Sequence, residues 1–436
     1  MKKIIDFVVI SLVLLILVGC TSNEACISES KEENNTTTIK VMTSYGGDDG
    51  NRKSFEDAVT SYEEATGNKV IDLSQISNEH WKERVISDFM TGSEPDVLFY
   101  FSNADANPFI NANKVVSIEE IREKYPDYAT NMKQKLIKTA PDGKHYAVPA
   151  TGFWETLFVN KEVLDKCGVD VPGADYTWNS FLEDCEKIKN NGYTPIACSL
   201  FEIPHYWFEF AVMNNGNVHN HLDLPIIDSN DKLVINETSQ KWINGLNDIK
   251  FLYDSGYFPE NTLIARDVET VAMFARGNAA FLLDGSWKVG YLNRHYPENI
   301  ENILVSYVPG KNERLASHAI GGISMGYFIT RKAWDDPEKR EAAVKFVFHM
   351  TSEEILGTFV TTESTALISG VNPDKLNPLQ KSAAEANTSF TEFTEPVQDT
   401  ILGEAKISLF YNIQEFIKGN ITAEEVIEKA MKLNEN

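Results

Sequence analysis

Blocks of apolar and polar residues alternate along the chain from residue 39 onward. Three short apolar runs, at 39–45, 69–73 and 96–101, have the length of buried strands. Large apolar residues recur at helical spacing between these runs, and a glycine ends each helical segment: Phe55, Val59 and Tyr62 before Gly67, and Trp81, Val85 and Phe89 before Gly92. This alternation of strands and helices predicts an α/β fold.

The loops that follow the predicted strands carry the first candidate ligand-binding residues. In α/β sheets the ligand crevice lies beyond the carboxyl ends of the strands, which here means residues 45–50 and 102–105. Tyr45 offers an aromatic ring and Asp49 a carboxylate beside a glycine-rich turn, and Asn103 follows the third strand. Asp49 could instead cap the next helix. A phosphate-binding loop is not indicated, because the G-x-x-x-x-G-K pattern is absent.

The N-terminal 19 residues have the pattern of a signal peptide. Lys2 and Lys3 precede the apolar run 7–18, which is too short for the roughly 20 residues of a membrane span. The run leads into Leu-Val-Gly-Cys20, which resembles the lipobox of bacterial lipoproteins and implies that Cys20 is lipidated. Residues 20–38 are almost wholly polar and predict a flexible tether. The expected location is therefore extracytoplasmic, on a lipid anchor in the bacterial cell membrane.

Composition and charge narrow the range of partners. Hydrophobic residues make up 42% of the chain, enough for sizeable cores, and the formal net charge of −24 argues against nucleic acid as a partner. The cysteines after Cys20 show no metal-site spacing, and we expect neither a metal nor a cofactor. A disulfide among Cys167, Cys185 and Cys198 is left open by the sequence.

A series of short motifs gives a more specific indication. In order, the chain reads EEATGNKV (63–70), WKER (81–84), GSEPDV (92–97), DGKHYAVP (142–149), VNKEVL (159–164), TWNSF (177–181), FLLDGSW (281–287), GGISMG (321–326) and EKREAA (338–343). Together these motifs resemble the signatures of family 1 extracellular solute-binding proteins, the sugar-binding lipoproteins of ABC importers, similar to maltodextrin-binding protein.

The resemblance implies a two-lobed periplasmic-binding-protein fold of type II with the ligand cleft between the lobes. The N-terminal lobe would comprise residues 39–151 plus 307–350, and the C-terminal lobe 152–306 plus 351–436. The chain would cross between lobes near 150–153, 306–309 and 350–352. It further implies a monomer that binds a sugar or short oligosaccharide, closes by a hinge motion and delivers the ligand to ABC permease subunits in the membrane.

Aromatic residues are the main candidates for sugar contact, because sugars present C–H-rich faces that stack on flat rings. Trp287 resembles a cleft aromatic of the family, Trp207 lies in an aromatic cluster, and Phe153 and Trp154 follow the first crossing. Packing in a core is the alternative for each. The remaining tryptophans fall on amphipathic helical patterns and are expected to be structural: Trp81, Trp178, Trp242 and Trp334.

The polar and glycine-rich parts of two motifs complete the expected site. Asp284 could accept hydrogen bonds from adjacent sugar hydroxyls, and the stretch that includes Gly321 and Gly322 would line the cleft. Residues 322–326 also fit G-x-S-x-G, but a hydrolase elbow needs a helix after the serine, and the sequence predicts a strand there. We expect no catalytic residue. The alternative function is a surface lipoprotein enzyme of the glycoside hydrolase type, which would need a pair of facing carboxylates that no motif identifies.

Overall fold

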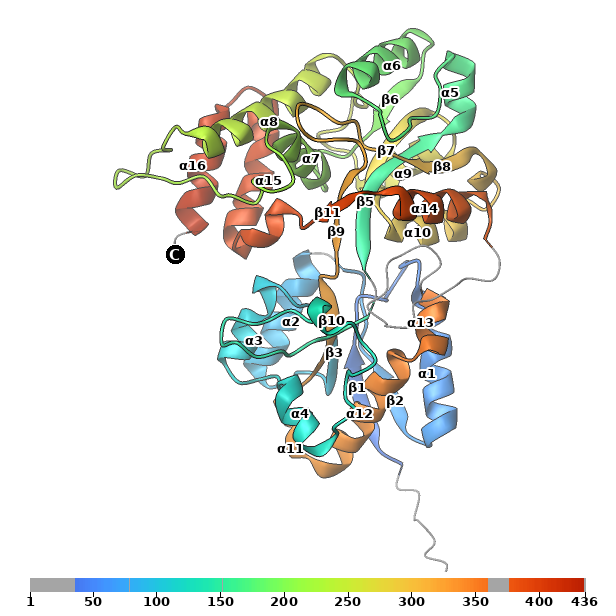
Figure 1. Cartoon of the computed structure of the whole chain (residues 1–436), viewed down its shortest axis with the longest axis vertical. Coiled ribbons are helices and arrows are strands. Elements are labelled where there is room, and N and C mark those ends of the chain that lie inside the picture. The colour runs from blue at the N-terminus through green and yellow to red at the C-terminus, as the bar shows by residue number, and fades with distance from the viewer. Residues whose placement is uncertain (1–35, 78, 151, 360–375, 435–436) are drawn as a thin grey trace, which may run out of the picture. The chain divides into compact units, whose positions relative to one another are not determined.

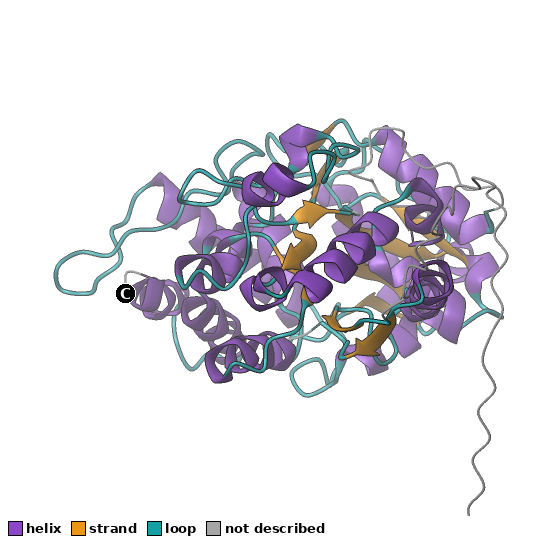
Figure 2. Cartoon of the chain, turned by 90° about the horizontal axis from the view of Figure 1, so that it is seen from below, coloured by secondary structure: helices purple, strands orange, loops and turns teal. Residues whose placement is uncertain are grey.

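The structure, a computed structural model, describes residues 36–77, 79–150, 152–359 and 376–434. The predicted signal peptide, the predicted lipidation site Cys20 and nearly all of the predicted tether lie outside these residues. The described chain contains two β-sheets with helices packed on both (Figures 1 and 2). The expected α/β class is confirmed.

The first sheet is built mainly from the N-terminal part of the chain. Its strands lie in the order β2 (Lys69–Asp72), β1 (Thr38–Met42), β3 (Val97–Phe101), β10 (Met325–Ile329) and β4 (Val148–Pro149). β1 runs parallel to β2 and β3, whereas β10 is antiparallel to β3 and β4. All three strands predicted from the apolar runs are therefore present.

Helices cover both faces of the first sheet because its strands are apolar on both sides. Along β3, Val97 and Phe99 face one core while Leu98 and Tyr100 face the other. The helices of this lobe are α1 (Arg52–Thr66), α2 (Glu79–Thr91), α3 (Asn107–Asn111), α4 (Ile118–Lys124), α11 (Arg331–Asp335), α12 (Pro337–Met350) and α13 (Glu353–Phe359), with 3-10 turns at Ala104–Ala106 and Gln134–Leu136.

The second sheet has six strands and a larger set of helices. The strand order is β11 (Glu392–Thr394), β9 (His318–Gly322), β5 (Phe153–Asn160), β7 (Ala279–Gly285) and β6 (Thr194–Ala197), and β8 (Ile303–Ser306) also pairs with β5. The helices are α5 (Lys161–Cys167), α6 (Trp178–Asn190), α7 (His205–Asn215), α8 (Glu237–Asp254), α9 (Asp267–Ala275), α10 (Trp287–His295), α14 (Pro378–Ser389), α15 (Gly403–Ile417) and α16 (Ala423–Asn434), with 3-10 turns at Ile300–Asn302 and η4 (Val397–Thr400).

The chain returns to the first sheet later than the sequence analysis placed it. β9 pairs with β5, whereas β10 pairs with β3, so the crossing lies between Gly322 and Met325 and not at 306–309. Residues 307–322 consequently pack with the second sheet. The reason is that the apolar run of β9 adds to the edge of β5 before the chain leaves that lobe.

The last crossing is also later than expected. α13 packs its buried residues Ile355, Leu356 and Phe359 into the core of the first lobe, so this helix does not belong to the second lobe. α14, which follows in the described chain, contributes Leu379 and Ala383 to a core of the second sheet. The helices after it pack on the second lobe as expected, since α15 and α16 share a core with α7 and α8.

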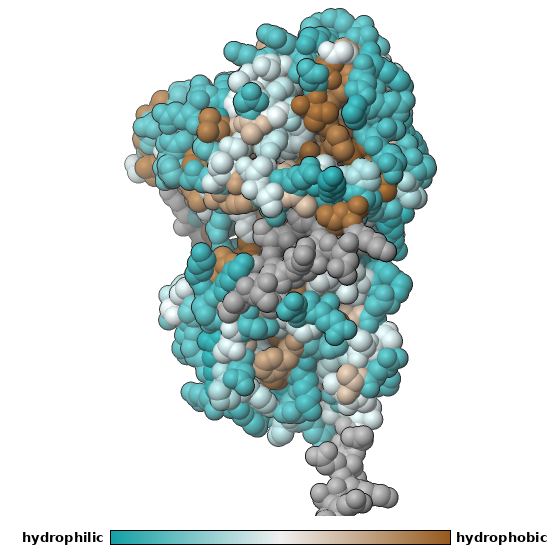
Figure 3. Space-filling view, turned by 45° about the vertical axis from the view of Figure 1, so that its right-hand side comes forward, coloured by the Kyte–Doolittle hydropathy of each residue, from teal (hydrophilic) through white to brown (hydrophobic). Residues whose placement is uncertain are grey.

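The described face in Figure 3 is mostly hydrophilic, and three of the described residues are buried cysteines. Hydrophilic residues cover most of the face shown in Figure 3, and hydrophobic residues gather in one area of its upper part. Within the described ranges, no helix has the length and apolar character needed to cross a membrane. Cys167, Cys185 and Cys198 are all buried as free thiols, which answers the question about a disulfide that the sequence left open.

Candidate functional site

A cavity of about 370 Å³ lies where the two lobes meet. Its first wall comes from the segment after β3 and from the loop before β4; the second wall comes from the segment between β11 and α15. The lining residues are Ser102, Asn103, Ala104, Asn107, Ile110, Lys138, Thr139, Ala140, Pro141, Tyr146, Ala147, Phe328, Glu395 and Asp399. Residues from distant parts of the sequence therefore form one concave surface of mixed polar and apolar character.

Asn103 is the predicted site residue that lines this cavity. Its side-chain oxygen accepts a hydrogen bond from the Asp105 backbone N–H at 3.0 Å, which caps the short turn after β3. This cap fixes the direction of the amide. Asn103 and Asp399, which come from different lobes, line the same cavity.

Asp399 and Glu395 were missed by the sequence analysis. Burial raises the pKa of Asp399, and Lys406 counteracts that rise. Glu395 forms an ion pair with Lys138 of the opposite wall. No motif after residue 371 pointed to these acids, because the resemblance to known signatures ends before them. Only their position in the fold identifies them.

The turn with Asp49 also touches the opposite lobe. The Asp49 backbone oxygen accepts a hydrogen bond from the Arg294 guanidinium at 3.0 Å, while its carboxylate accepts one from the Asn51 N–H at 2.8 Å. Burial raises the pKa of Asp49 to about 6. Gly50 lies against Gly290 so closely that a Cβ on Gly50 would come within 2.9 Å of the Gly290 carbonyl carbon. The turn is thus an interlobe contact.

Three half-buried or nearly buried aromatic rings lie together in the C-terminal lobe. The Trp287 ring centroid lies 6.0 Å from that of Phe153 and 6.0 Å from that of Tyr206. Trp287 can adopt this position because residue 285 is glycine: a Cβ there would lie 2.1 Å from the indole. Two predicted residues, Phe153 and Trp287, are therefore brought together, and Tyr206 joins them.

Other predicted aromatic residues lie in hydrophobic cores. Tyr45 packs between Phe55, Phe99 and Phe359 with 6% of its surface exposed. Trp154 is fully buried with its ring against Phe390.

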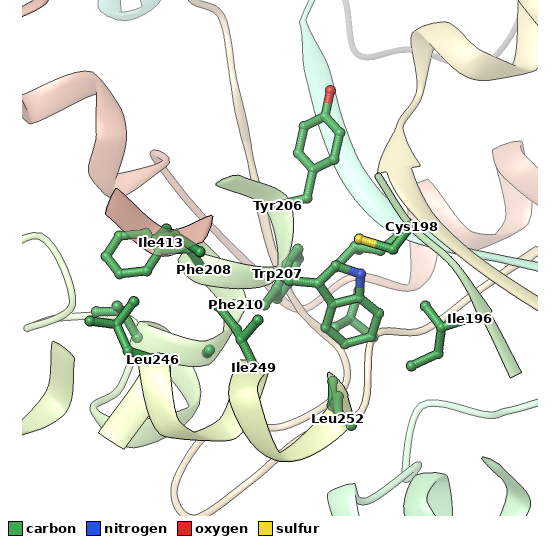
Figure 4. Packing of buried hydrophobic residues seen from close by; sticks show 14 of the residues in the cluster. Ile196, Cys198, Tyr206, Trp207, Phe208, Phe210, Leu246, Ile249, Leu252 and Ile413 are labelled. Atoms are coloured by element: carbon green, nitrogen blue, oxygen red, sulfur yellow. The ribbon is translucent and has the colours of Figure 1, made fainter. Parts of the chain in front are cut away.

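Trp207 belongs to the large core of the second lobe. Its indole lies near Cys198, Ile249 and Leu252, whereas the ring of the preceding residue, Tyr206, belongs to the same core but points in another direction (Figure 4). Tyr206 and Trp207 of α7 thus both belong to the core, and the Tyr206 ring also contacts Trp287.

Asp284 is held by internal ion pairs. Its carboxylate lies 3.0 Å from Lys288 Nζ, which is also 2.9 Å from Asp267. Burial raises the pKa of Asp284 to about 6, although Lys288 opposes this shift. Asp284 is completely buried. Its carboxylate pairs with Lys288 and accepts a hydrogen bond from the backbone N–H of Gly285.

The two predicted cleft glycines sit in the β5–β9 pairing. Gly321 is opposite Trp154 and Gly322 is opposite Phe153. A Cβ on Gly321 would lie 2.6 Å from the Phe153 carbonyl oxygen, whereas a Cβ on Gly322 would meet no atom within 4 Å. Gly321 is therefore required by strand packing, and Gly322 leaves open space.

The G-x-S-x-G match is not a nucleophile elbow. Strand β10 follows Ser324, and the Ser324 carbonyl oxygen accepts a hydrogen bond from the Ser102 N–H at 2.6 Å. His349, the only histidine after Ser324, lies 2.8 Å from Ser61 Oγ in the first lobe. No group of side chains in the described ranges has a metal-binding arrangement.

Chemically, the cavity offers hydrogen-bond acceptors and donors around an open volume. Carboxylates, amides and the Tyr146 hydroxyl, which donates to Asp142 at 2.6 Å, can exchange hydrogen bonds with a polyhydroxylated molecule. A volume of a few hundred Å³ is that of a small-molecule site.

Known proteins of similar structure support this assignment of the fold. The chitin oligosaccharide binding protein superposes with a TM-score of 0.77 at 20% identity, covering 92% of this chain and 98% of the other. RafE in complex with raffinose gives a TM-score of 0.72 at 20% identity, covering 91% and 98%.

Two comparisons of the amino-acid sequence also relate the chain to solute-binding proteins. The sn-glycerol-3-phosphate-binding periplasmic protein UgpB of Rhizobium meliloti (strain 1021) is 23% identical over 409 residues, 87% of each chain. The family model described as bacterial extracellular solute-binding protein matches residues 47–355, which is more than half of the chain. The chain, with its two α/β lobes and the cavity between them, therefore belongs to the bacterial extracellular solute-binding protein family.

Proposed function

We propose that this chain is the substrate-binding component of an ABC importer and takes up a sugar or short oligosaccharide. The cavity between the lobes carries this proposal, since a ligand there would contact both walls and favour their approach. A permease in the membrane would then recognise the closed form and receive the ligand.

A neutral saccharide fits the charges of the cavity better than a phosphate ester does. Its lining carries Glu395, Asp399 and a single lysine, Lys138, which is already paired with Glu395. A phosphate group would meet the Asp399 carboxylate without a cation of its own on this lining. The relative UgpB is named for glycerol 3-phosphate, so this chain would differ from it in ligand class.

Within this proposal, the predicted site residues divide into three sets. Asn103 would contact the ligand directly, and Phe153 with Trp287 would supply rings for stacking as the lobes move. Asp49, Asp284, Gly321 and Gly322 would shape the walls. Tyr45, Trp154 and Trp207 would support these walls from the cores. The two-lobe division and the hinge crossings form part of the same proposal.

We also propose that the protein is a monomeric lipoprotein, tethered through lipidated Cys20 after removal of residues 1–19, and that it is not an enzyme. Metabolic labelling with a fatty acid should mark the wild-type protein and not Cys20→Ala. Persistent labelling of the variant would contradict the anchor.

The experiment for the function is isothermal titration calorimetry of the soluble chain from residue 36 onward. The ligands are chitobiose, raffinose and glycerol 3-phosphate, and chromatography of each mixture after incubation detects turnover. Saturable binding of a saccharide without cleavage supports the proposal. Cleavage would favour the glycoside hydrolase alternative, and binding of glycerol 3-phosphate alone would overturn the ligand class.

A further inference from the structure

Two glutamates on neighbouring elements meet in the interior of the second lobe. Glu155 lies on β5 and is 2% exposed; Glu209 lies on α7 and is 0% exposed. Glu155 Oε2 and both carboxyl oxygens of Glu209 are buried without a hydrogen-bond partner among the described residues. In the part of the chain that the structure describes, neither carboxyl forms an ion pair.

The surroundings of this pair are more acidic than basic. Asp284 on β7 faces Glu155, and Asp399 on η4 faces both glutamates. The Tyr206 hydroxyl on α7 is close to the same acids. Lys406 on α15 is the cation that faces Glu209, but its effect is smaller than those of burial and of the neighbouring acids.

The remaining charged groups around the pair are engaged with other partners. Lys288 on α10 pairs with Asp284 and with Asp267 on α9. Lys82 lies 3.6 Å from Asp105, and both influence Asp399. Two ionised carboxylates that are buried without hydrogen-bond donors or a paired cation are strongly unfavourable, so this arrangement requires protons.

We propose that the Glu155–Glu209 pair is a proton-binding site that holds the cavity-lining segment 395–400 in place, so that loss of protons at alkaline pH loosens this wall. Asp399 is the link: its turn, η4, packs on α7, which carries Glu209, and Asp399 itself lines the cavity together with Asn103. Negative charge on the pair repels Asp399 and weakens the contact of the segment with both lobes. This proposal does not depend on which ligand the cavity takes.

The direction of the pH effect follows from the pKa of these groups. Burial raises the pKa of Glu155 from 4.5 to about 8 and that of Glu209 well above its usual value. The pKa is raised while segment 395–400 is in place, so the stabilisation of this segment by the pair is complete below about pH 4.5. It is lost as pH rises through about 8. Each proton released on opening increases the opening constant about tenfold per pH unit within this window.

Hydrogen exchange at segment 395–400, corrected for the intrinsic rate at each pH, tests the proposal on the ligand-free protein. In the wild type, the opening constant should rise at least tenfold per pH unit between pH 6 and 8. The double variant Glu155→Gln/Glu209→Gln keeps the shape and cannot ionise, so its opening constant should stay constant. Glu183→Gln, an exposed change on α6, is the matched control and should behave as the wild type.

Equal pH dependence in the wild type and the double variant would overturn the proposal. If the double variant does not fold, the infrared spectrum of the wild type tests whether the pair binds protons. A protonated-carboxyl band present at pH 6 and lost at pH 9.5, and weaker in Glu209→Gln, supports the pair as the proton site. A wild-type spectrum without such a band overturns it.

Discussion

The adjacent glycines Gly321 and Gly322 give the sharpest test of how the two strands β5 and β9 are packed. We consider Gly321→Ala, with Gly322→Ala as its matched control on the same strand. At Gly321 the new Cβ would lie 2.6 Å from the Phe153 carbonyl oxygen and 3.0 Å from the Trp154 Cα and Cβ. Two of these three atoms are backbone and cannot rotate away, so the strands must move apart.

The expected cost follows from this geometry. Inserting a group into a packed interior typically costs about 1–3 kcal/mol, and a clash with backbone should fall in the upper half of that range. We expect a loss of roughly 2–3 kcal/mol for Gly321→Ala. At Gly322 no atom lies within 4 Å of the new Cβ, so a change below about 0.5 kcal/mol is expected.

Differential scanning calorimetry of the ligand-free protein measures both effects. A destabilisation of 1 kcal/mol lowers the melting temperature of a unit of 150–250 residues by about 2–4 °C, so Gly321→Ala should lower that of the second lobe by about 5–10 °C. Gly322→Ala should change it by less than about 2 °C. An unchanged melting temperature for Gly321→Ala, or equal losses for both variants, would refute the packing argument.

Three further changes have definite expected outcomes. Arg314 is 2% exposed and donates hydrogen bonds to the carbonyl oxygens of Pro309 and His318, both at 2.8 Å; Arg314→Leu leaves these acceptors unpaired and should cost about 3–5 kcal/mol in urea unfolding. A loss below 1 kcal/mol would show that this network adds little. Gly285→Ala places a Cβ 2.1 Å from the Trp287 indole, so the near-ultraviolet circular dichroism of the folded protein should change, and an unaltered spectrum would contradict this. Lys138→Gln breaks a partly exposed ion pair with Glu395 and should cost less than about 1 kcal/mol at low salt and nothing at 1 M salt; a salt-independent loss would point to another cause.

The local elements could be predicted from sequence because short-range signals determine them. The strands β1, β2 and β3 follow from apolar runs, and α1 ends where Gly67 adopts a positive φ of 74° and its N–H bonds to the Glu63 carbonyl. These features need no knowledge of the rest of the chain.

The lobe boundaries and one ring of the aromatic group, that of Tyr206, could not be predicted in the same way. Whether β9 pairs with β5 depends on which sheet edge is free, and that is a property of the whole fold. Trp207 and Tyr206 are neighbours in one core, yet the Trp207 ring packs against Phe181 and Phe258, whereas the Tyr206 ring packs against Trp287.

The acids Glu395 and Asp399 illustrate the remaining limit. They reach the cavity from a segment that is nearly 300 residues from Asn103, and no local pattern marks them. Long-range contacts of this kind appear only once the chain is folded.

The central claim is that the cavity between the walls 102–107 and 395–399 binds the ligand. The most direct measurement uses the saccharide that binds in the calorimetric panel. Its affinity is measured by calorimetry for the variants Asp399→Asn and Asn103→Ala. Asn230→Ala, an exposed change outside the cavity lining, is the control. Loss of a hydrogen bond to a charged group costs about 1.5–3 kcal/mol, so the affinity for Asp399→Asn should fall about 10- to 150-fold, with a smaller loss for Asn103→Ala and none for the control. Affinities equal to the wild type in both cavity variants would contradict the claim.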